Sequence, residues 1–383
     1  MLLRHHFVRP FAACALLVTA AACGDGGGGP TDPPGEGEIR VTVSMDGPVP
    51  DRDGVKVWVG SVLGGTISTG TVTFPGLPAG THTVQLQNVS RNCKPSRETT
   101  GQVVVAAGQT TTFEVHLSCP GTGLAYVDGH GTADLRIRYP WSEQGEVLAS
   151  GVMYAIPAWS PDRYSLVFAR EEGSMAAIWK MDVETGVKTR LGGGGARSSY
   201  YPDWSPDGAR IAYVGLTAEL RGELRVMNAD GSGDGPLMAQ GQPVPGLTPA
   251  WSPDGTRIAY RVYRDGTTHL YVVAADGLTA PVALNVSTGD DTTISWSPDG
   301  EWLVYSAGQD VHVVRPDGSG HRNVTPTVGL PEEYPTFRGN GRIGFSASLS
   351  ASGTDAWDIA LDGTGRTNLT NTPTEAERHP AWQ

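Results

Sequence analysis

The sequence has little of several features that define common functional classes. It has four cysteines, with no Cys-x-x-Cys pair and no Cys/His cluster, so the usual zinc sites are excluded. Its 28 lysines and arginines are outnumbered by 40 acidic residues and form no basic run. Such a balance does not fit nucleic acid or an anionic lipid surface as a partner. No Gly-x-Ser-x-Gly pentapeptide occurs, which excludes a serine hydrolase of the α/β type.

The N-terminus has the pattern of an export signal. Arg4 and Arg9 precede an apolar run over residues 11–22, which is too short to span a bilayer and suits a signal peptide at 1–22. The run ends in small residues before Cys23, which resembles the lipobox of bacterial lipoproteins and implies acylation of Cys23. Ala20 stands where that family usually has leucine. The alternative is an ordinary cleaved signal in which Cys23 has no role.

Residues 23–37 are rich in glycine and proline and carry no apolar anchor, so we expect a tether. Gly24 in place of aspartate resembles lipoproteins of the outer membrane. The resemblance implies a lipid-anchored protein there, facing the periplasm or the cell surface, with no membrane contact other than the lipid. In that oxidising compartment Cys93 and Cys119 are expected to pair, which would stabilise by about 3 to 4 kcal/mol, and two free thiols are the alternative.

Residues 38–119 show repeated alternation of apolar and polar positions. The runs are short and are bounded by glycine, proline, aspartate or asparagine, which is typical of half-buried strands. We predict a small β-sandwich of immunoglobulin or transthyretin type. Residues 74–84 resemble a turn-and-strand segment of transthyretin-like and carboxypeptidase-regulatory-like domains, which implies a spacer or adhesion unit.

An internal repeat dominates residues 120–383. The pattern Pro-x-Trp-Ser-Pro-Asp-Gly, complete or degenerate, recurs about every 45 residues, with its aromatic residue at Trp159, Trp204, Trp251, Trp296, Phe337 and Trp382. In each repeat a strand ends on the aromatic residue, the chain turns, and three further strand-like segments follow. Four strands per repeat is the composition of a propeller blade.

These repeats resemble the WD40-like repeats of TolB-like propellers. The segment at 120–383 starts on what matches a second strand and finishes on the missing first strand, residues 379–382. We therefore predict an all-β chain: a sandwich followed by a six-bladed propeller that its C-terminal strand closes. Closure would remove open sheet edges.

Residues 230–235 resemble a calcium loop, but the glutamate expected after its glycine is Gly241. Similar turns recur at 317–320 and 362–365. A hairpin turn is the favoured interpretation.

The positions just before the repeat proline are predicted to open onto one mouth of the central channel, as the resemblance to these propellers implies. They are Ile156, Tyr201, Thr248, Thr293, Tyr334 and His379. Nearby loops add Tyr200, Asp290, Asp291, Glu332, Glu333, Glu375, Glu377 and Arg378. From these we select Tyr201, Asp291, Glu333, Tyr334, Arg378 and His379 as the candidate binding rim.

The leading hypothesis is a monomeric cell-envelope scaffold whose rim binds a protein or peptide, with no catalytic residues and no cofactor. A sugar or a channel cation such as calcium is an alternative ligand. A solvated acidic rim that binds no ligand is the alternative without a binding function. The alternative from another class is a propeller enzyme of lactonase or sugar-dehydrogenase type. It would need a metal held in the channel, where Asp203, Ser295 and Thr336 are the polar residues between the proline and the aromatic.

Overall fold

The computed structural model describes residues 35–47, 50–119, 124–128, 132–139, 145–153, 157–192, 196–288, 293–326, 331–338, 341–350, 353–370 and 377–381. The predicted signal peptide and most of the tether, with Cys23, lie outside these residues. In the described part every regular element is a β-strand, and no helix there is long and apolar enough to cross a membrane. The all-β prediction is confirmed.

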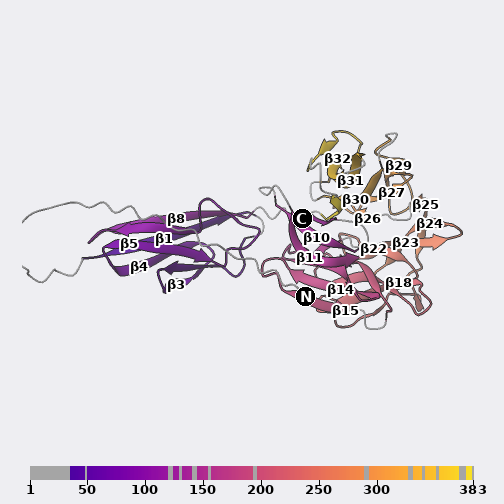
Figure 1. Cartoon of the computed structure of the whole chain (residues 1–383). Helices are drawn as coiled ribbons and strands as arrows, with labels where there is room; N and C mark the ends of the chain where they lie inside the picture. The colour runs from indigo at the N-terminus through magenta and orange to yellow at the C-terminus, as the bar shows by residue number, and fades with distance from the viewer. Residues whose placement is uncertain are drawn as a thin grey trace, which may run out of the picture.

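The first unit is a sandwich of two four-stranded sheets (Figure 1). One sheet has the order β4 (Gly70–Pro78), β1 (Glu36–Asp46), β8 (Thr110–Ser118), β6 (Lys94–Pro95). The other has the order β3 (Val62–Ile67), β2 (Val55–Val59), β5 (Gly80–Gln87), β7 (Thr100–Val105).

Alternation in the sequence places every second side chain of these strands between the sheets. Ile39, Val41 and Val43 of β1 are at most 1% exposed, as are Phe113 and the other inward residues of β8. The two strands run parallel, with Ile39 opposite Thr111, and share one core. Cys93 and Cys119 form a disulfide that ties the segment before β6 to the end of β8.

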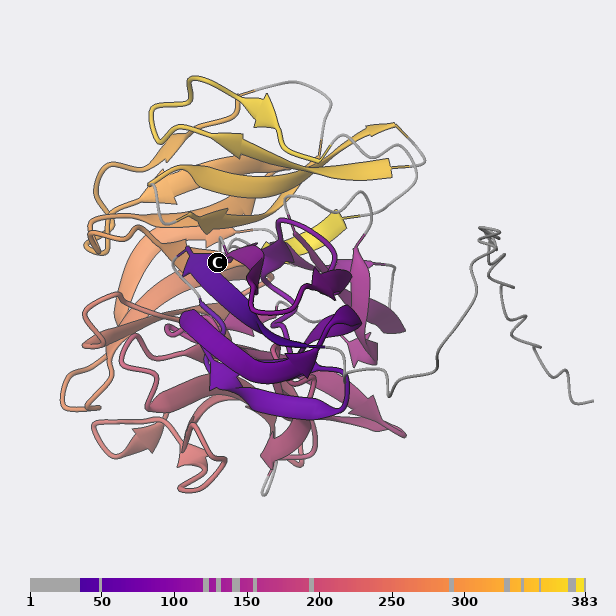
Figure 2. The same cartoon turned by 90° about the vertical axis from the view of Figure 1, so that its left-hand side faces the viewer.

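The second unit is a ring of six blades, which Figure 2 shows with the sandwich in front of it. Blades 2 to 6 each take four consecutive strands. Their bounds are β12 (Ala158–Trp159), β13 (Ser165–Glu172), β14 (Met175–Asp182), β15 (Lys188–Gly192); β16 (Ser199–Trp204), β17 (Arg210–Leu216), β18 (Gly222–Asn228), β19 (Gly235–Pro236); β22 (Leu247–Trp251), β23 (Arg257–Arg264), β24 (Thr267–Ala274), β25 (Val282–Thr288); β26 (Ile294–Trp296), β27 (Leu303–Ala307), β28 (Asp310–Val314), β29 (Arg322–Asn323); and β30 (Glu332–Phe337), β31 (Ile343–Ser350), β32 (Gly353–Ile359), β33 (Thr367–Asn368). A small hairpin, β20 (Met238–Ala239) and β21 (Gln242–Pro243), follows blade 3.

Blade 1 is assembled from both ends of the propeller segment. It contains β9 (Leu124–Asp128), β10 (Thr132–Arg138) and β11 (Glu146–Met153), and its innermost strand is β34 (Glu377–Ala381). β34 pairs antiparallel with β9, with Arg378 opposite Val127. The predicted closure by the C-terminal strand is confirmed.

The Ser-Pro-Asp-Gly turns have a common hydrogen-bond design. The serine hydroxyl donates to the aspartate Oδ1 and accepts the backbone N–H five residues further on, as in Ser205 with Asp207 (2.6 Å) and Arg210 (2.8 Å). Gly208 has a φ of 70°, which favours glycine. These bonds fix the direction in which the second strand leaves each turn. The sequence pattern is therefore explained by the fold alone.

Arginine and tryptophan side chains join neighbouring blades. Arg210 lies over the ring of Trp251 at 4.7 Å, and Arg257 lies over Trp296 at 4.8 Å, one blade further on. The indole Nε1 of Trp296 donates to the carbonyl oxygen of Ala250 (3.0 Å). Blades 4 and 5 thus pack their aromatic residues against the previous blade, where both apolar burial and cation–π attraction stabilise the ring.

Strand direction defines two faces of the propeller. The turn face carries the turns from first to second and from third to fourth strands, and the mouth face carries the starts of the inner strands. The described contacts of the sandwich reach the turn face. The Tyr164 hydroxyl donates to the carbonyl oxygen of Pro50 (2.8 Å), and Arg91 pairs with Glu146. The sandwich therefore touches blades 1 and 2 on the side opposite the predicted rim.

Candidate functional site

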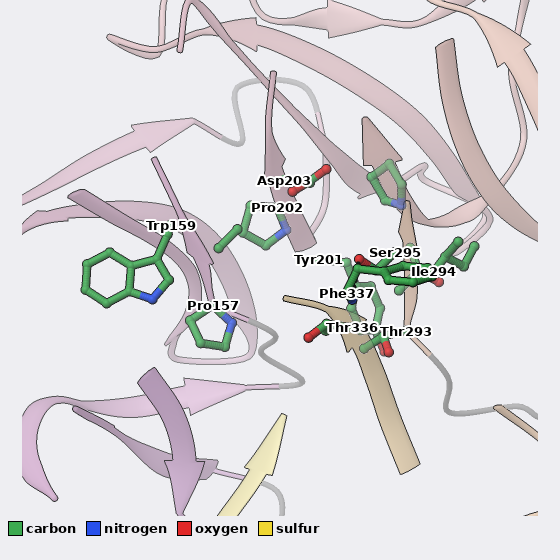
Figure 3. A pocket seen from close by; sticks show the side chains of 13 residues that line it. Pro157, Trp159, Tyr201, Pro202, Asp203, Thr293, Ile294, Ser295, Thr336 and Phe337 are labelled. Carbon is green, nitrogen blue, oxygen red and sulfur yellow. Dashed lines mark hydrogen bonds between the residues drawn. The ribbon is translucent and has the colours of Figure 1, made fainter. Parts of the chain in front are cut away.

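The channel through the ring contains a cavity of about 220 Å³ (Figure 3). Inner strands of five blades supply its described lining. These residues are Pro157, Ala158, Trp159, Tyr201, Pro202, Asp203, Thr248, Pro249, Thr293, Ile294, Ser295, Thr336 and Phe337. Because each of these repeats places proline (Ile294 in blade 5), one small or polar residue and an aromatic on the inner strand, the wall combines apolar surface with a few polar groups.

Three residues at the start of the inner strands share an unusual backbone conformation. Tyr201, Thr248 and Tyr334 have φ values of 53°, 48° and 55°, and each precedes a proline. Non-glycine residues seldom adopt this left-handed region, and a following proline restricts them further. Strand pairing shifts register at each of the three positions, so each is a β-bulge that turns the backbone at the mouth.

The three bulges coincide with the repeat proline. In blade 5 the residue after Thr293 is Ile294 and not proline, and Thr293 does not have a positive φ. Its hydroxyl donates to the carbonyl oxygen of Pro335 (2.7 Å), so it links blade 5 to blade 6. Strained, bulged residues gather at binding sites more often than elsewhere, which makes the mouth the candidate site.

Asp203 is a carboxylate inside the channel wall. Its Oδ2 accepts the backbone N–H of Trp251, in the next blade, at 2.7 Å. The surrounding protein raises its pKa to about 7, because burial penalises the charged form more than the hydrogen bonds from Trp251 and Trp204 favour it. Asp203 therefore joins two blades and changes charge near neutral pH.

Ser295 repeats this connection two blades further on. Its hydroxyl accepts the backbone N–H of Phe337 at 3.0 Å. Ala158 and Ala250 hold the same position in other repeats and have no side chain that could do so. Asp203 and Ser295 thus join neighbouring blades, whereas the buried hydroxyl of Thr336, at the same position in blade 6, has no hydrogen-bond partner in the described part of the chain.

Of the candidate binding rim, Tyr201 lines the cavity. The mouth positions Thr248 and Thr293, which were not selected for the rim, line it as well. Glu333 and Tyr334 are half-buried on β30, outside its lining. Asp291 lies outside the described residues, as do Ile156, Asp290 and Glu375. Arg378 and His379 are placed in β34 by their backbone, and their side chains, like that of Glu377, lie outside the described part.

The prediction that Glu332 belongs to a loop near the mouth is wrong. Glu332 is fully buried, and Arg366 pairs with it at 2.5 Å, so it is not a solvent-facing rim residue. The sequence missed this because Arg366 lies in another part of blade 6. It also missed Arg261, which is 2% exposed and donates from Nε to the Thr248 hydroxyl at 2.5 Å. This hydrogen bond holds the side chain of Thr248, one of the three residues with positive φ, in place.

A channel metal would need several convergent ligands. Of the described residues that line the cavity, Asp203 is the one carboxylate, and none is histidine or cysteine. The predicted calcium-like loop is a hairpin turn in which the Asp230 carboxylate accepts from the N–H (2.9 Å) and hydroxyl (2.6 Å) of Ser232. Within the described ranges, one group of three or more acidic residues lies close enough to hold a metal ion, and it lies away from the channel.

The geometry defines a closed six-bladed β-propeller in which the inner strands of blades 2 to 6 end on an aromatic residue. The family model of the TolB beta propeller domain (PD40) matches residues 157–383, more than half of the chain. The protein therefore belongs to the TolB β-propeller family. No curated protein matches it by sequence.

Solved structures show the same fold at low identity. TolB from Acinetobacter baumannii is 21% identical, with a TM-score of 0.54, over 68% of this chain and 66% of that one. A chain from a nidogen/laminin complex is 12% identical, with a TM-score of 0.50, over 67% and 96%. A hydrazine synthase from Kuenenia stuttgartiensis is 13% identical, with a TM-score of 0.52, over 68% and 46%. Because an enzyme and a member of a protein complex share it, the fold alone does not define the function.

Proposed function

We propose that this protein is a lipid-anchored scaffold of the cell envelope whose propeller mouth binds a segment of a protein partner. The observation that carries the proposal is the ring of bulged, strained residues Tyr201, Thr248 and Tyr334 around the mouth. Strain of this kind is retained where the surrounding structure needs those side chains in a fixed direction. The lipid anchor at Cys23, at the outer membrane, is supported by the sequence pattern of the export signal.

The size of the cavity favours a peptide segment over a free small molecule. Pockets for drug-sized ligands have about 300 to 1,000 Å³. At about 220 Å³ the cavity takes one or two side chains, while the rest of a partner would lie across the rim. Its walls of proline and aromatic residues suit an apolar side chain, and Asp203 and Ser295 suit a polar tip.

The position of the sandwich also supports binding at the mouth. Its described contacts are with the turn face, so it leaves the opposite face open to a large partner. The TolB family and the nidogen/laminin complex are consistent in kind with a propeller that binds proteins.

Site-specific photocrosslinking in cells tests this function. A photoreactive amino acid at Tyr201 or Tyr334 should give a discrete crosslinked band. The matched control is Tyr263, which is 63% exposed at the end of β23, on the same face but towards the outside of the disc. Equal crosslinking at Tyr263, or none at the two rim positions, would refute binding at the mouth.

A further inference from the structure

The junction between the sandwich and the propeller contains a second cluster of polar residues. Residues 50–54, between β1 and β2, meet the turns of blade 2. The Arg52 guanidinium donates from Nη2 to Asp182 Oδ2 (2.7 Å) and lies over the Tyr164 ring at 4.5 Å. The two units are thus joined by polar and charged groups.

Three carboxylates converge beside Arg52. Oxygen atoms of Asp51, Asp53 and Glu184 all lie within 4.8 Å of one another. Asp51 and Asp53 belong to the sandwich, and Glu184 belongs to the turn between β14 and β15 of the propeller. The cluster exists only while the two units are in contact.

The Glu184 carboxylate is buried without full compensation. Its side chain is 6% exposed, its Oε1 accepts the backbone N–H of Arg52 (3.1 Å), and its Oε2 accepts no hydrogen bond. The nearest positive charge to Oε2 is Arg52 Nε, at 3.6 Å, which is beyond hydrogen-bond distance. A buried carboxylate oxygen in this position requires a further partner.

The other two carboxylates are fixed in place. Asp51 is 2% exposed and accepts the N–H groups of Gly54 (2.8 Å) and Ser90 (3.0 Å). Asp53 accepts the side-chain amide of Asn88 at 3.0 Å. These bonds hold the carboxylates close together against their repulsion, as in a preformed cation site.

The charges around the cluster do not balance. Three carboxylates lie within 4.8 Å of one another, and the Arg52 guanidinium beside Glu184 (3.6 Å) is shared with a further carboxylate, that of Asp182 (2.7 Å). A third bare carboxylate is unfavourable here, because the Glu184 side chain is 6% exposed and its oxygen lies within 4.8 Å of oxygens of Asp51 and Asp53. A divalent cation removes this repulsion, and an all-oxygen ligand set selects a hard cation. Ca²⁺ fits better than Mg²⁺, because it accepts several carboxylates in flexible geometry and Mg²⁺ keeps most of its water.

We propose that Asp51, Asp53 and Glu184 form a Ca²⁺ site that fastens the sandwich to the propeller. Two ligands come from one unit and one from the other, so Ca²⁺ binding and the docking of the units stabilise each other. This site is separate from the proposed mouth and does not depend on it.

Calorimetric titration of the purified, chelator-treated protein with CaCl₂ tests the site. We expect one Ca²⁺ per chain, and binding at least 10-fold weaker in Glu184→Gln and in Asp53→Asn. The matched control is Asp230→Asn, which changes an exposed turn carboxylate in the calcium-like loop and should bind as wild type does. Mg²⁺ at the same concentration should bind more weakly than Ca²⁺.

A second measurement follows the junction itself. Ca²⁺ should protect the segment at residues 50–54 from proteolysis in wild type and not in Glu184→Gln. Circular dichroism should confirm that Glu184→Gln and Asp53→Asn are folded. Asp53 is exposed, so its variant keeps the test valid if Glu184→Gln fails to fold. No binding at millimolar Ca²⁺, or unchanged binding in both variants, would overturn the proposal. Protection that follows pH and ignores Ca²⁺ would assign the cluster to proton sharing instead.

Discussion

Asp203 should make the propeller less stable as the pH rises, and its replacement by asparagine should remove this effect. The ring raises the pKa of Asp203 from 3.8 to about 7. A carboxyl group with a higher pKa in the folded state binds its proton more tightly there than in the unfolded chain. Its unfavourable contribution is therefore absent below about pH 4, grows between about pH 4 and 7, and is constant above about pH 7.

The size of the effect follows from that difference. A rise of about three pKa units corresponds to about 4 kcal/mol, at about 1.4 kcal/mol per unit. One side of Asp203 faces the channel, where water screens the charge, so we expect roughly half of this value, about 2 kcal/mol. Asparagine has nearly the same shape, and its carbonyl oxygen can accept the same bond from Trp251.

Urea denaturation of wild type and Asp203→Asn between pH 4 and pH 8.5 measures the prediction. Tryptophan fluorescence is a suitable signal, because Trp204 and Trp251 adjoin Asp203. The free energy of unfolding should be similar for the two proteins at pH 4 and about 2 kcal/mol higher for the variant at pH 8.

Asp254→Asn provides a control of opposite sign. The Ser252 hydroxyl and the Thr256 N–H lower the pKa of Asp254 to about 2. Asp254 therefore stabilises the fold above about pH 4, and this contribution is lost as the pH falls towards 2. Its variant should be less stable than wild type at neutral pH. The reasoning is refuted if Asp203→Asn differs from wild type by the same amount at pH 4 and pH 8.

Three further predictions concern the closure, the anchor and the disulfide. Deleting residues 377–383 removes β34 and exposes β9, so the cooperative thermal transition of the propeller should be lost; an unchanged melting temperature would contradict closure. Cys23→Ser should abolish incorporation of labelled palmitate in cells, whereas continued labelling would exclude this residue as the lipid site. Cys93→Ala with Cys119→Ala opens a loop of 26 residues and should lower the free energy of unfolding of the sandwich by about 3.5 kcal/mol; a loss below about 1 kcal/mol in urea titrations would contradict this.

The architecture was predictable because its information is local and repeated. Each Trp-Ser-Pro-Asp-Gly unit contains a buried aromatic, a complete turn and the start of the next strand. The sequence contains six repeats, and the first blade is divided between the two ends of the propeller segment. A closed ring is therefore the arrangement that leaves no sheet edge open. The alternation in residues 38–119 predicts the sandwich for the same reason, since inward and outward positions follow directly from the pleat.

The site was less predictable because its details depend on contacts between distant segments. The position of the mouth follows from the repeat, but the left-handed backbone of Tyr201 and Tyr334 arises from β-bulges that become visible only in the pairing of the strands. Glu332 follows a loop-like stretch of sequence, and its burial depends on the pairing with Arg366, which lies 34 residues further along the chain. The cluster with Glu184 joins parts of the chain about 130 residues apart in two different units, and only their docking reveals it.

The attachment of the sandwich to the turn face also sets a direction for the whole molecule. Strand β1 starts at Glu36 and ends at Asp46, close to the segment that touches the propeller, and its 11 residues span about 36 Å at 3.3 Å per residue. The chain therefore enters the sandwich at the end that is farther from the propeller (Figure 1). A lipid attached ahead of Glu36 would thus reach the molecule through the sandwich, and the mouth face lies on the side of the propeller opposite the sandwich.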